Sequence, residues 1–325
     1  MPFISVIIPL YNASAFIERC AKSLFEQTLD DVEFIFVDDC SIDCSYDVLK
    51  GVIVNYPQRD IKVIHHESNK GSATARNTGL RNASGTYVTF ADSDDYLDKD
   101  GLHGIYDILQ NNEVDILICD YFGGAGDQAK VCKQERAWCK NNVDYLKVFL
   151  SEPSYGSTCN KIYRKSFVDS TTQFFLDGAD MWEDLSWNMR LFCMTDRIMY
   201  SQLCYYHYCW DNANSIIHQL SEESRCRKIE QESNNLSVAL DVFEQKGLLE
   251  DLDREIKIRK LYIRDNFLIN PSSSSLNAWR NLYPDSNKVI MGINRSWAYR
   301  VILKMLSVGF NLPYLLYHKY VLKKR

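Results

Sequence analysis

The first hundred residues alternate short apolar runs with amphipathic segments, and this alternation limits the folds that the chain can adopt. Apolar, β-branched runs occur at residues 3–8, 32–37, 61–64 and 87–90. Segments with helical spacing of apolar residues separate them. Strands buried on both faces give such continuous runs, and helical crossovers between them require parallel pairing. The pattern therefore predicts an α/β fold, a mostly parallel, doubly wound sheet with helices on both faces.

Polar side chains follow three of these four strands. Tyr11 and Asn12 follow the first, Asp38 and Asp39 follow the second, and the sequence Asp-Ser-Asp-Asp at residues 92–95 follows the last. Ligands of open α/β sheets bind outside the carboxyl ends of the strands. We therefore expect these side chains to line one crevice.

The acidic cluster at residues 92–95 has two interpretations. Three carboxylates within four residues repel one another, and Mg²⁺ or Mn²⁺ bound to carboxylates and substrate phosphates would offset that charge. The alternative is a polar turn whose aspartate caps a helix at residues 101–109. The first strand is followed by neither a Gly-x-Gly-x-x-Gly nor a Gly-Lys-Ser/Thr sequence. A bound diphosphate would therefore need a metal ion rather than a glycine-rich loop.

Beyond residue 98 the pattern predicts further strands, helices and turns. Ser14 is the expected cap of the first helix, and a later helix opens on a glycine turn at residues 69–71. The remaining expectations are strands at 113–121 and 205–208, a glycine-rich hairpin turn at 123–128, helices at 142–150 and 185–193, amphipathic helices over 221–270, and a linker at 271–275.

Charge and cysteine content bear on location and partners. The net charge is −6, yet every charged residue from Ser286 onward is basic, which gives +8 there and −14 before it. This asymmetry favours a surface-associated protein and no nucleic-acid partner. The eleven cysteines are odd in number and lack zinc-finger spacing, and the chain begins without a secretory signal pattern. Reduced thiols and a cytoplasmic protein are expected.

The basic C-terminal tail, residues 286–325, is also rich in aromatic residues and leucine. Its longest uncharged run, 305–317, has 13 residues, whereas a helix that spans a bilayer needs about 20. An interfacial helix on an anionic membrane is one interpretation, which would make the protein peripheral on the inner face of the cytoplasmic membrane. The other is that Trp297, Ile302, Leu306 and Phe310 pack on the catalytic domain.

Four linked motifs carry a family resemblance. They are Ser-Val-Ile-Ile-Pro-Leu-Tyr-Asn at 5–12, Val-Asp-Asp-Cys-Ser-Ile-Asp at 37–43, the segment at 69–79 with Asn-Lys-Gly and Ala-Arg-Asn-Thr-Gly, and the acidic cluster. In order and spacing they resemble the family 2 glycosyltransferases with the GT-A fold, of the bacterial surface-polysaccharide type. The resemblance implies a catalytic domain at 1–220, with a nucleotide-binding half at 1–97 and an acceptor-side half at 98–220, followed by a helical region at 221–325.

The resemblance also implies a reaction. It would be an inverting, metal-dependent transfer of a hexosyl or N-acetylhexosaminyl group from a nucleotide-diphosphate sugar, with a UDP-sugar expected. The acceptor would be a hydroxyl of a glycan or lipid-linked glycan, in capsule, O-antigen or exopolysaccharide synthesis. An oxocarbenium-like transition state needs a metal at the departing diphosphate and a carboxylate base at the acceptor hydroxyl.

Site residues are carried over from the matching motifs. The resemblance makes Asp184 of the Trp-Glu-Asp sequence the base, and a helix cap is its alternative. Glu183 would steer the acceptor, and Trp182 would stack on a sugar ring or lie in the core. The metal ligands would be Asp94 and Asp92, with His207 as a further ligand or else a core residue. The nucleotide-sugar contacts would be Pro9, Tyr11, Asn12, Asp39, Ser41, Gly71, Arg76, Asp92 and Ser93.

Two other classes of function stay open. A nucleotidyltransferase on a similar sheet would want a glycine-rich loop with a basic residue after the first strand, and residues 9–14 contain neither. A non-catalytic nucleotide-sugar-binding module would not need Asp94 and Asp184 together.

Overall fold

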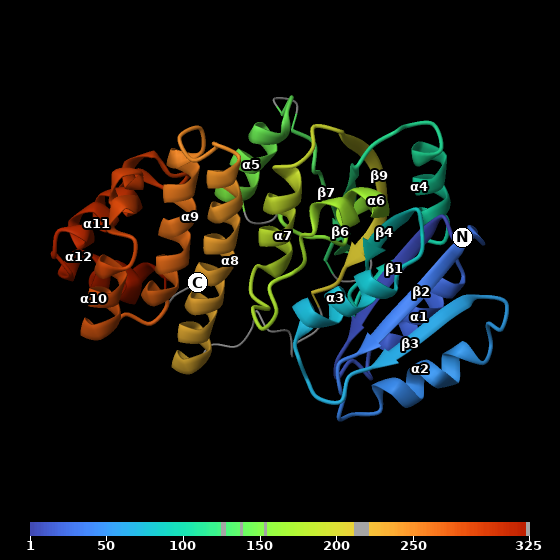
Figure 1. Ribbon diagram of the computed structural model, residues 1–325. Coiled ribbons are helices and arrows are strands. Elements are labelled where there is room, and N and C mark those ends of the chain that lie inside the picture. Colours follow the sequence, from blue (N-terminus) through green and yellow to red (C-terminus); the bar gives the residue numbers. More distant parts are fainter. Residues whose placement is uncertain (125–127, 137–138, 153–154, 211–220, 323–325) are drawn as a thin grey trace.

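A single mixed sheet runs through the catalytic half of the molecule (Figure 1). The computed structural model describes residues 1–124, 128–136, 139–152, 155–210 and 221–322. Within these residues nine strands form the sheet, in the order β3-β2-β1-β4-β8-β6-β9-β5, with β7 paired to β6. The fold class predicted from the sequence is confirmed.

The first half of the sheet is parallel. Strand β1 (Ile4–Leu10) lies between β2 (Val32–Asp38) and β4 (Tyr87–Phe90), and β3 (Asp60–His65) pairs with β2. The connecting helices are α1 (Ile17–Phe25), α2 (Ser45–Ile53) and α3 (Ser72–Asn82). Phe34 on β2 packs against Phe25 of α1, whereas Ile35 packs against Ala75 of α3. Because successive side chains of a strand point to opposite faces, α1 and α3 cover opposite sides of the sheet.

The second half of the sheet is mixed, which the sequence did not indicate. The strands are β5 (Tyr96–Leu97), β6 (Ile116–Gly123), β7 (Lys130–Cys132), β8 (Lys161–Arg164) and β9 (Ile198–Tyr208). Strand β8 is antiparallel to both β4 and β6, whereas β6 and β9 are parallel. The helices are α4 (Gly101–Leu109), α5 (Asn142–Ser151), α6 (Lys165–Thr171) and α7 (Glu183–Phe192).

The C-terminal region is helical, as expected. It contains α8 (Glu222–Gln245), α9 (Asp253–Asp265), α10 (Ser273–Asn281), α11 (Trp297–Ser307) and α12 (Leu312–Tyr317), with shorter turns η4 (Asn266–Leu268), η5 (Pro284–Lys288), η6 (Ile290–Gly292) and η7 (His318–Leu322). The main hydrophobic core continues from the sheet into α8 and α9. A second core joins α9, α10, α11 and α12. The domain boundary at residue 220 stays a prediction.

Two local predictions were wrong. Ser14 does not cap the first helix, because α1 begins at Ile17 behind Phe16 and has no side-chain cap. Residues 271–275 are not a linker, because Ser272 and Ser275 form a capping box that starts α10. The run of four serines therefore caps a helix and does not form a flexible linker. The predicted hairpin turn joins β6 and β7, but its residues 125–127 lie outside the described residues, as does 211–220.

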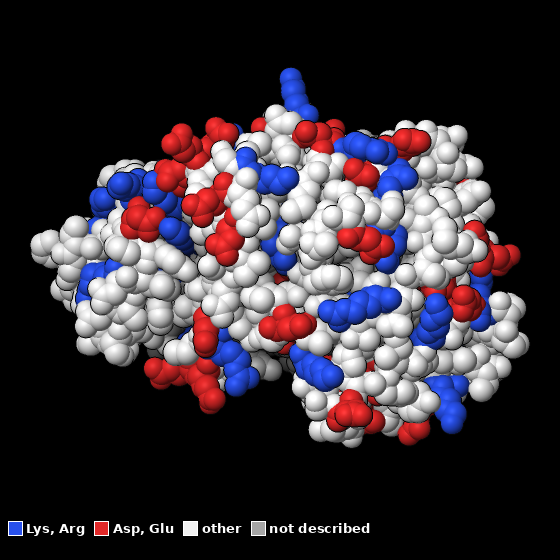
Figure 2. Space-filling model, in the orientation of Figure 1, with Lys and Arg blue, Asp and Glu red and all other residues white. Residues whose placement is uncertain are grey.

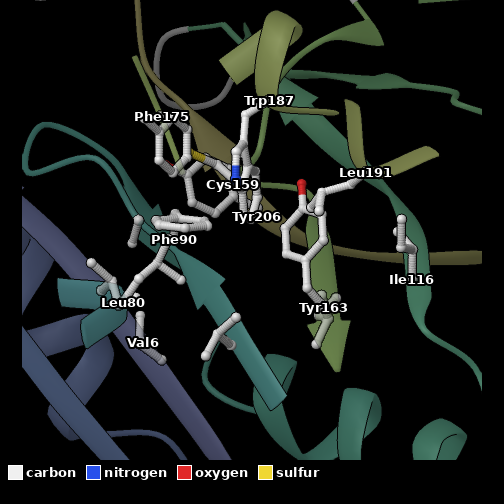
Figure 3. Close-up of a cluster of buried hydrophobic side chains, with 14 of the residues drawn as sticks. Val6, Leu80, Phe90, Ile116, Cys159, Tyr163, Phe175, Trp187, Leu191 and Tyr206 are labelled. Carbon is white, nitrogen blue, oxygen red and sulfur yellow. The ribbon is translucent and has the colours of Figure 1, made fainter. Parts of the chain in front are cut away.

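An aromatic cluster joins the two halves of the sheet behind the predicted site (Figure 3). Phe175 stacks on Trp187 of α7 with ring centroids 4.6 Å apart, and Phe90 of β4 meets Trp187 edge-on at 5.6 Å. Tyr163 of β8 meets the same indole at 4.8 Å. Such pairs add about 0.5–1.5 kcal/mol each beyond the burial of their area. The cluster fixes the end of β4, which carries the acidic residues, against α7.

Candidate active site

The loops after β1 and β2 are tied together at the carboxyl edge of the sheet. The Asn12 backbone N–H donates to Ser41 Oγ at 3.2 Å, and Asn12 Oδ1 accepts from the Ile42 N–H at 2.9 Å. Asn12 has a φ of 49°, a left-handed conformation that asparagine tolerates better than most residues. Tyr11 is 45% exposed beside it. Pro9 lies in β1, two residues before the loop.

Asp39 is buried and firmly held. Its carboxylate accepts from the N–H groups of Lys70 and Gly71, the latter at 2.7 Å, and lies 2.6 Å from His66 Nδ1. The neighbouring Asp38 accepts from the Ser41 N–H, a contact within the loop that follows β2. His66 was missed by sequence reasoning; its position one residue after β3 was the available signal.

The segment around Gly71 explains why the third motif has its composition. Gly71 has a φ of 89°, and a Cβ built there would lie 2.2 Å from Asp180 Oδ2. Asp180 in turn accepts from the Ala73 N–H at 3.0 Å, at the start of α3. Asn77 bonds the 175–177 segment through the backbone of Phe175. Glycine at 71 is therefore required both by the backbone conformation and by the close approach of Asp180.

Arg76 connects the two halves of the site. Its guanidinium donates to Glu183 Oε1 at 2.6 Å and to Asp92 Oδ1 at 2.9 Å, and the residue is only 6% exposed. The geometry gives Arg76 two internal ion pairs, and the nucleotide contact that the resemblance implies stays a prediction. Burial raises the pKa of Glu183, and the Arg76 guanidinium opposes that rise.

The three carboxylates of the acidic cluster have different surroundings. Asp92 receives Arg76 and, at 3.5 Å, the thiol of Cys159. Asp95 is buried and accepts from the Tyr206 hydroxyl at 2.5 Å and from the Cys209 N–H at 2.8 Å. Asp94, like Ser93, is half-buried, and its backbone carbonyl accepts from Arg19. Asp95 is thus a structural residue that ties β9 to the cluster.

The interpretation of this cluster as a helix cap is wrong. The N-cap of α4 is Asp100, outside the cluster, and its side chain makes no cap hydrogen bond. Burial and the charges of Asp92 and Asp94 together raise the pKa of Asp95. The cluster therefore concentrates negative charge at the end of β4.

The donor set of the cluster fits a hard divalent cation. Asp92 and Asp94 offer carboxylate oxygens, the ligands that Mg²⁺ and Mn²⁺ prefer. Among the described residues no group of three or more His, Cys, Asp or Glu forms a complete cage. Magnesium is commonly bound through one or two carboxylates plus substrate phosphates. Asp92 and Asp94 are suited to that kind of shared site.

His207 lies in an aromatic stack. Its ring is 4.2 Å from Tyr96 and 4.5 Å from Phe122, with both pairs close to parallel, and Nε2 is 2.8 Å from Asp98 Oδ1. These contacts account for a histidine in this strand without a metal. Its role as a ligand stays a prediction.

The predicted base opens α7. Asp184 lies in the first turn of this helix, where Oδ1 accepts from the Leu185 N–H at 2.6 Å. A carboxylate in the first turn is also what the helix-cap interpretation requires, because the helix dipole stabilises a negative charge there. This position therefore fits both interpretations of Asp184. Burial raises the pKa of Asp184, while Arg76 opposes the rise.

Lys161 is a buried lysine to which sequence reasoning gave no role. Its Nζ donates to the Tyr155 carbonyl at 2.8 Å, the Ser157 carbonyl at 2.5 Å and Asn160 Oδ1 at 3.1 Å. Burial lowers the pKa of Lys161 to about 7, and the charge of Asp184 opposes the fall. Three acceptors match the three protons of an ammonium group. Lys161 thus supplies positive charge near the predicted base.

Trp182 precedes the helix in a left-handed conformation, with a φ of 62°. It is half-buried, and the guanidinium of Arg259 lies 4.5 Å above its ring. One face of the indole is therefore occupied by the C-terminal region.

Comparison with known proteins identifies the family. A family model described as glycosyl transferase family 2 matches residues 5–171. EpsJ of Bacillus subtilis (strain 168), described as an uncharacterized glycosyltransferase, is 29% identical over 204 residues, which are 61% of this chain and 58% of EpsJ. The match thus spans about three fifths of this curated relative's length.

Solved structures show the same fold. The S. aureus TarS 1–349 crystal structure in complex with UDP-GlcNAc matches 100% of this chain and 93% of its own, with a TM-score of 0.72 and 19% identity. The mannosyltransferase PcManGT from Pyrobaculum calidifontis, in complex with GDP-Man and Mn²⁺, matches 98% of this chain and 87% of its own, with a TM-score of 0.53 and 14% identity. Since the family model covers more than half of the sequence, this chain belongs to glycosyl transferase family 2.

Proposed function

We propose that this protein is an inverting, metal-dependent glycosyltransferase that moves a sugar from a nucleotide-diphosphate sugar to a hydroxyl of a glycan or lipid-linked glycan. The observation that carries the proposal is the ion-pair bridge of Arg76, which joins Asp92 of the acidic cluster to Glu183 beside the predicted base. Donor-side and acceptor-side carboxylates thereby face one site.

The proposed chemistry divides between these carboxylates. Asp92 and Asp94 would hold a divalent cation, which when bound offsets the charge that gathers on the departing diphosphate. Asp184 would take the proton of the acceptor hydroxyl as general base. One base opposite the leaving group gives attack from the far side of the sugar, and hence inversion. Glu183, which accepts from Arg76, would orient the acceptor.

A UDP-sugar is the donor that we propose. Asp39 lies at the end of β2 in the position that the family motif gives to the uracil contact, with Tyr11, Asn12 and Ser41 close by. TarS, which has the same fold, was solved with UDP-GlcNAc, and PcManGT with Mn²⁺. Capsule, O-antigen or exopolysaccharide synthesis is the corresponding process.

A donor panel tests this proposal against the other two classes. We expect one nucleotide sugar among UDP-, GDP- and dTDP-sugars to release its nucleotide with added Mn²⁺ and to stop doing so with EDTA, as measured by mass spectrometry. Cleavage of a nucleoside triphosphate with pyrophosphate release would instead identify a nucleotidyltransferase. Binding of a donor without any turnover, with or without glycan acceptors, would identify a binding module.

The C-terminal tail presents a basic and apolar surface. Leu303, Leu306 and Tyr314 enter the second core, formed with α9 and α10. By contrast Trp297 is 68% exposed and Phe310 is 63% exposed, so neither packs on the catalytic domain. Figure 2 shows a broad uncharged area at the α11–α12 end of the molecule, with Lys and Arg side chains beside it. None of the described helices has the length and apolar character needed to cross a membrane.

We propose that this surface, which consists of α11, α12, η7 and the turn between α11 and α12, attaches the protein to an anionic membrane. Its exposed apolar side chains would enter the headgroup region, and each basic residue near the surface adds about 1 kcal/mol. The exposed apolar side chains are Trp297, Met305, Val308, Phe310, Leu312, Leu315, Leu316, Tyr320, Val321 and Leu322. Lys323, Lys324 and Arg325 lie outside the described residues.

Co-sedimentation with lipid vesicles tests the attachment. We expect the full chain to bind anionic vesicles more tightly than neutral ones, and less tightly at high salt. Lys319→Glu should weaken binding by about fivefold or more, because a charge worth about 1 kcal/mol is lost and reversed. The combined change of Trp297, Phe310 and Leu312 to Ala should weaken it further.

The matched control for this surface is Val54→Ala with Val131→Ala, which removes exposed apolar side chains on other elements. Equal vesicle binding by the control and the tail variants would contradict the attachment. Substitutions are preferable to deletion of the tail, because deletion would expose the second hydrophobic core to solvent.

A further inference from the structure

The segment that leads to the predicted base is held in an unfavourable backbone conformation. We call residues 177–182 the base loop, since it enters α7 two residues before Asp184. Trp182, its last residue, has a φ of 62°. A bulky residue stays in the left-handed region only where its surroundings over-determine the backbone. The contacts that hold this loop therefore matter for where Asp184 lies.

One side of the base loop is held by the donor half. Asp180 accepts from the Ala73 N–H at 3.0 Å, and Asp177 accepts from the Thr74 hydroxyl at 2.9 Å, both in the first turn of α3. Glu183 then follows with its ion pair to Arg76. These contacts link the loop to the nucleotide side of the site.

The other side is held by two amides of α8: Gln231 Nε2 donates to the Gly178 carbonyl at 3.1 Å, and the buried Asn235 makes two further bonds. Asn235 Nδ2 donates to the Ala179 carbonyl at 3.0 Å and to the Met181 carbonyl at 2.8 Å, and the residue is 1% exposed. The backbone carbonyl of Asn235 accepts from the Ser186 hydroxyl at 2.8 Å. One residue of the C-terminal region thus bonds the loop before Asp184 and the helix after it.

The chemistry of this contact is specific to an amide donor. Both protons of the Asn235 NH₂ group are used, while its Oδ1 has no hydrogen-bond partner among the described residues. A carboxylate of the same shape would face the two carbonyls with an oxygen, and an apolar side chain would leave both unpaired. The two donor bonds are what this position contributes.

Arg259 of α9 reinforces the same loop. It is fully buried, donates to the Phe149 carbonyl, and lies with its guanidinium 4.5 Å above the ring of Trp182. The space between Trp182, Asn235 and Arg259 is too small for a water molecule. A loop shift toward the C-terminal region is therefore blocked by packing.

We propose that the C-terminal helical region is a working part of the active site, in which Asn235 is a positioning residue that sets the base loop and hence the place of Asp184. The inference rests on the proposed function, because it takes Asp184 to be the base. Asn235 touches neither substrate nor metal in this account. It acts through the backbone of Ala179 and Met181.

The test measures kcat and the donor KM of Asn235→Ala and Asn235→Asp, each expressed per folded molecule from circular dichroism and thermal unfolding. A misplacement of about 1 Å can cost about 10²-fold in rate, and we expect kcat to fall by about 10- to 100-fold. The donor KM should change less than about twofold, because Asn235 itself bonds the base loop and Ser186 and none of Asp39, Gly71 and Asp92.

Asn266→Ala is the matched control. Asn266 is also a buried asparagine of the C-terminal region, and its amide donates to Glu232 and to the Ile263 carbonyl, with no contact to the base loop. A lower melting temperature with wild-type kcat per folded molecule is expected for this control. The same outcome for both Asn235 variants would overturn the inference, as would a fall in kcat matched by Asn266→Ala.

The inference and the proposed function fail differently. If Asp184→Asn keeps wild-type turnover, the proposed base is wrong. If Asp184→Asn loses turnover while the Asn235 variants keep theirs, only the positioning role is wrong. Should Asn235→Ala not fold, the nearly isosteric Asn235→Asp supplies the same comparison.

Discussion

Asp94→Ala is expected to abolish sugar transfer and to remove the metal dependence of nucleotide binding, while the protein stays folded. Asp92 is bonded to Arg76 and Cys159, and Asp95 to Tyr206 and Cys209. Asp94 is half-buried at the end of the same strand. A bound metal stabilises transition-state charge by several kcal/mol, and each ~1.4 kcal/mol is tenfold, so we expect at least a roughly thousandfold loss of kcat.

The melting temperature separates this effect from damage to the fold. The charge of Asp94 raises the pKa of the buried Asp95, after burial itself and Asp92, so removing it relieves repulsion rather than adding any. Asp100→Ala is the control, since within the described part of the chain the side chain of this exposed aspartate bonds only the Thr28 hydroxyl. Calorimetric titration with UDP, with and without Mn²⁺, gives the binding readout. Wild-type turnover by Asp94→Ala would end the proposed metal role.

The sequence predicted the first half of the fold well because each βα unit there is locally encoded. Strands β1, β2 and β4 are buried along nearly all of their length, and the polar residues of the predicted site follow their carboxyl ends. The mixture of parallel and antiparallel pairs among strands β5, β6, β7, β8 and β9 was not predicted. These pairs depend on which strands are neighbours in the sheet, and the alternation of apolar residues does not encode the order of the strands.

The long-range contacts of the site could not be predicted from the sequence either. Arg76 and Glu183 were both expected near the active site, but the direct bond between them crosses 107 residues. The roles of Asp180 and Asn235 follow from the backbone groups that they bond, and the role of His66 follows from its contacts with the Asp39 and Thr78 side chains. None of these contacts has a sequence signature. The serine run at 272–275 had two meanings, linker and helix cap, and only the following helix α10 decided between them.

Asp184→Asn is expected to lower kcat by at least about 10²–10⁴-fold, the range typical of a general base, while donor affinity stays close to that of the wild type. The asparagine Oδ1 can still accept from the Leu185 N–H, so the start of α7 keeps its shape. The effect should therefore fall on kcat rather than on nucleotide binding, which titration with UDP measures independently.

The same variant should shift the pH dependence of stability. Burial raises the pKa of Asp184 above the ordinary aspartate value. The folded state therefore holds this proton more tightly than the unfolded chain does, and ionisation costs stability above the folded pKa but not below the unfolded one. Asp184→Asn removes that cost. Its melting temperature should equal or exceed that of the wild type at neutral pH, and the difference should vanish in acid.

A matched control distinguishes the base from a helix-capping carboxylate. Asp144 lies in the first turn of α5 and accepts from the Lys140 N–H, far in sequence from the site. If Asp184 served only the α7 dipole, Asp144→Asn and Asp184→Asn would both lose a small amount of stability, about 0.3–1 kcal/mol, and both would keep kcat.

In wild-type enzyme kcat should fall as the pH drops through the raised pKa of Asp184, because the protonated carboxyl cannot accept the acceptor's proton. A wild-type acid limb that persists unchanged in Asp184→Asn would assign the base to another group.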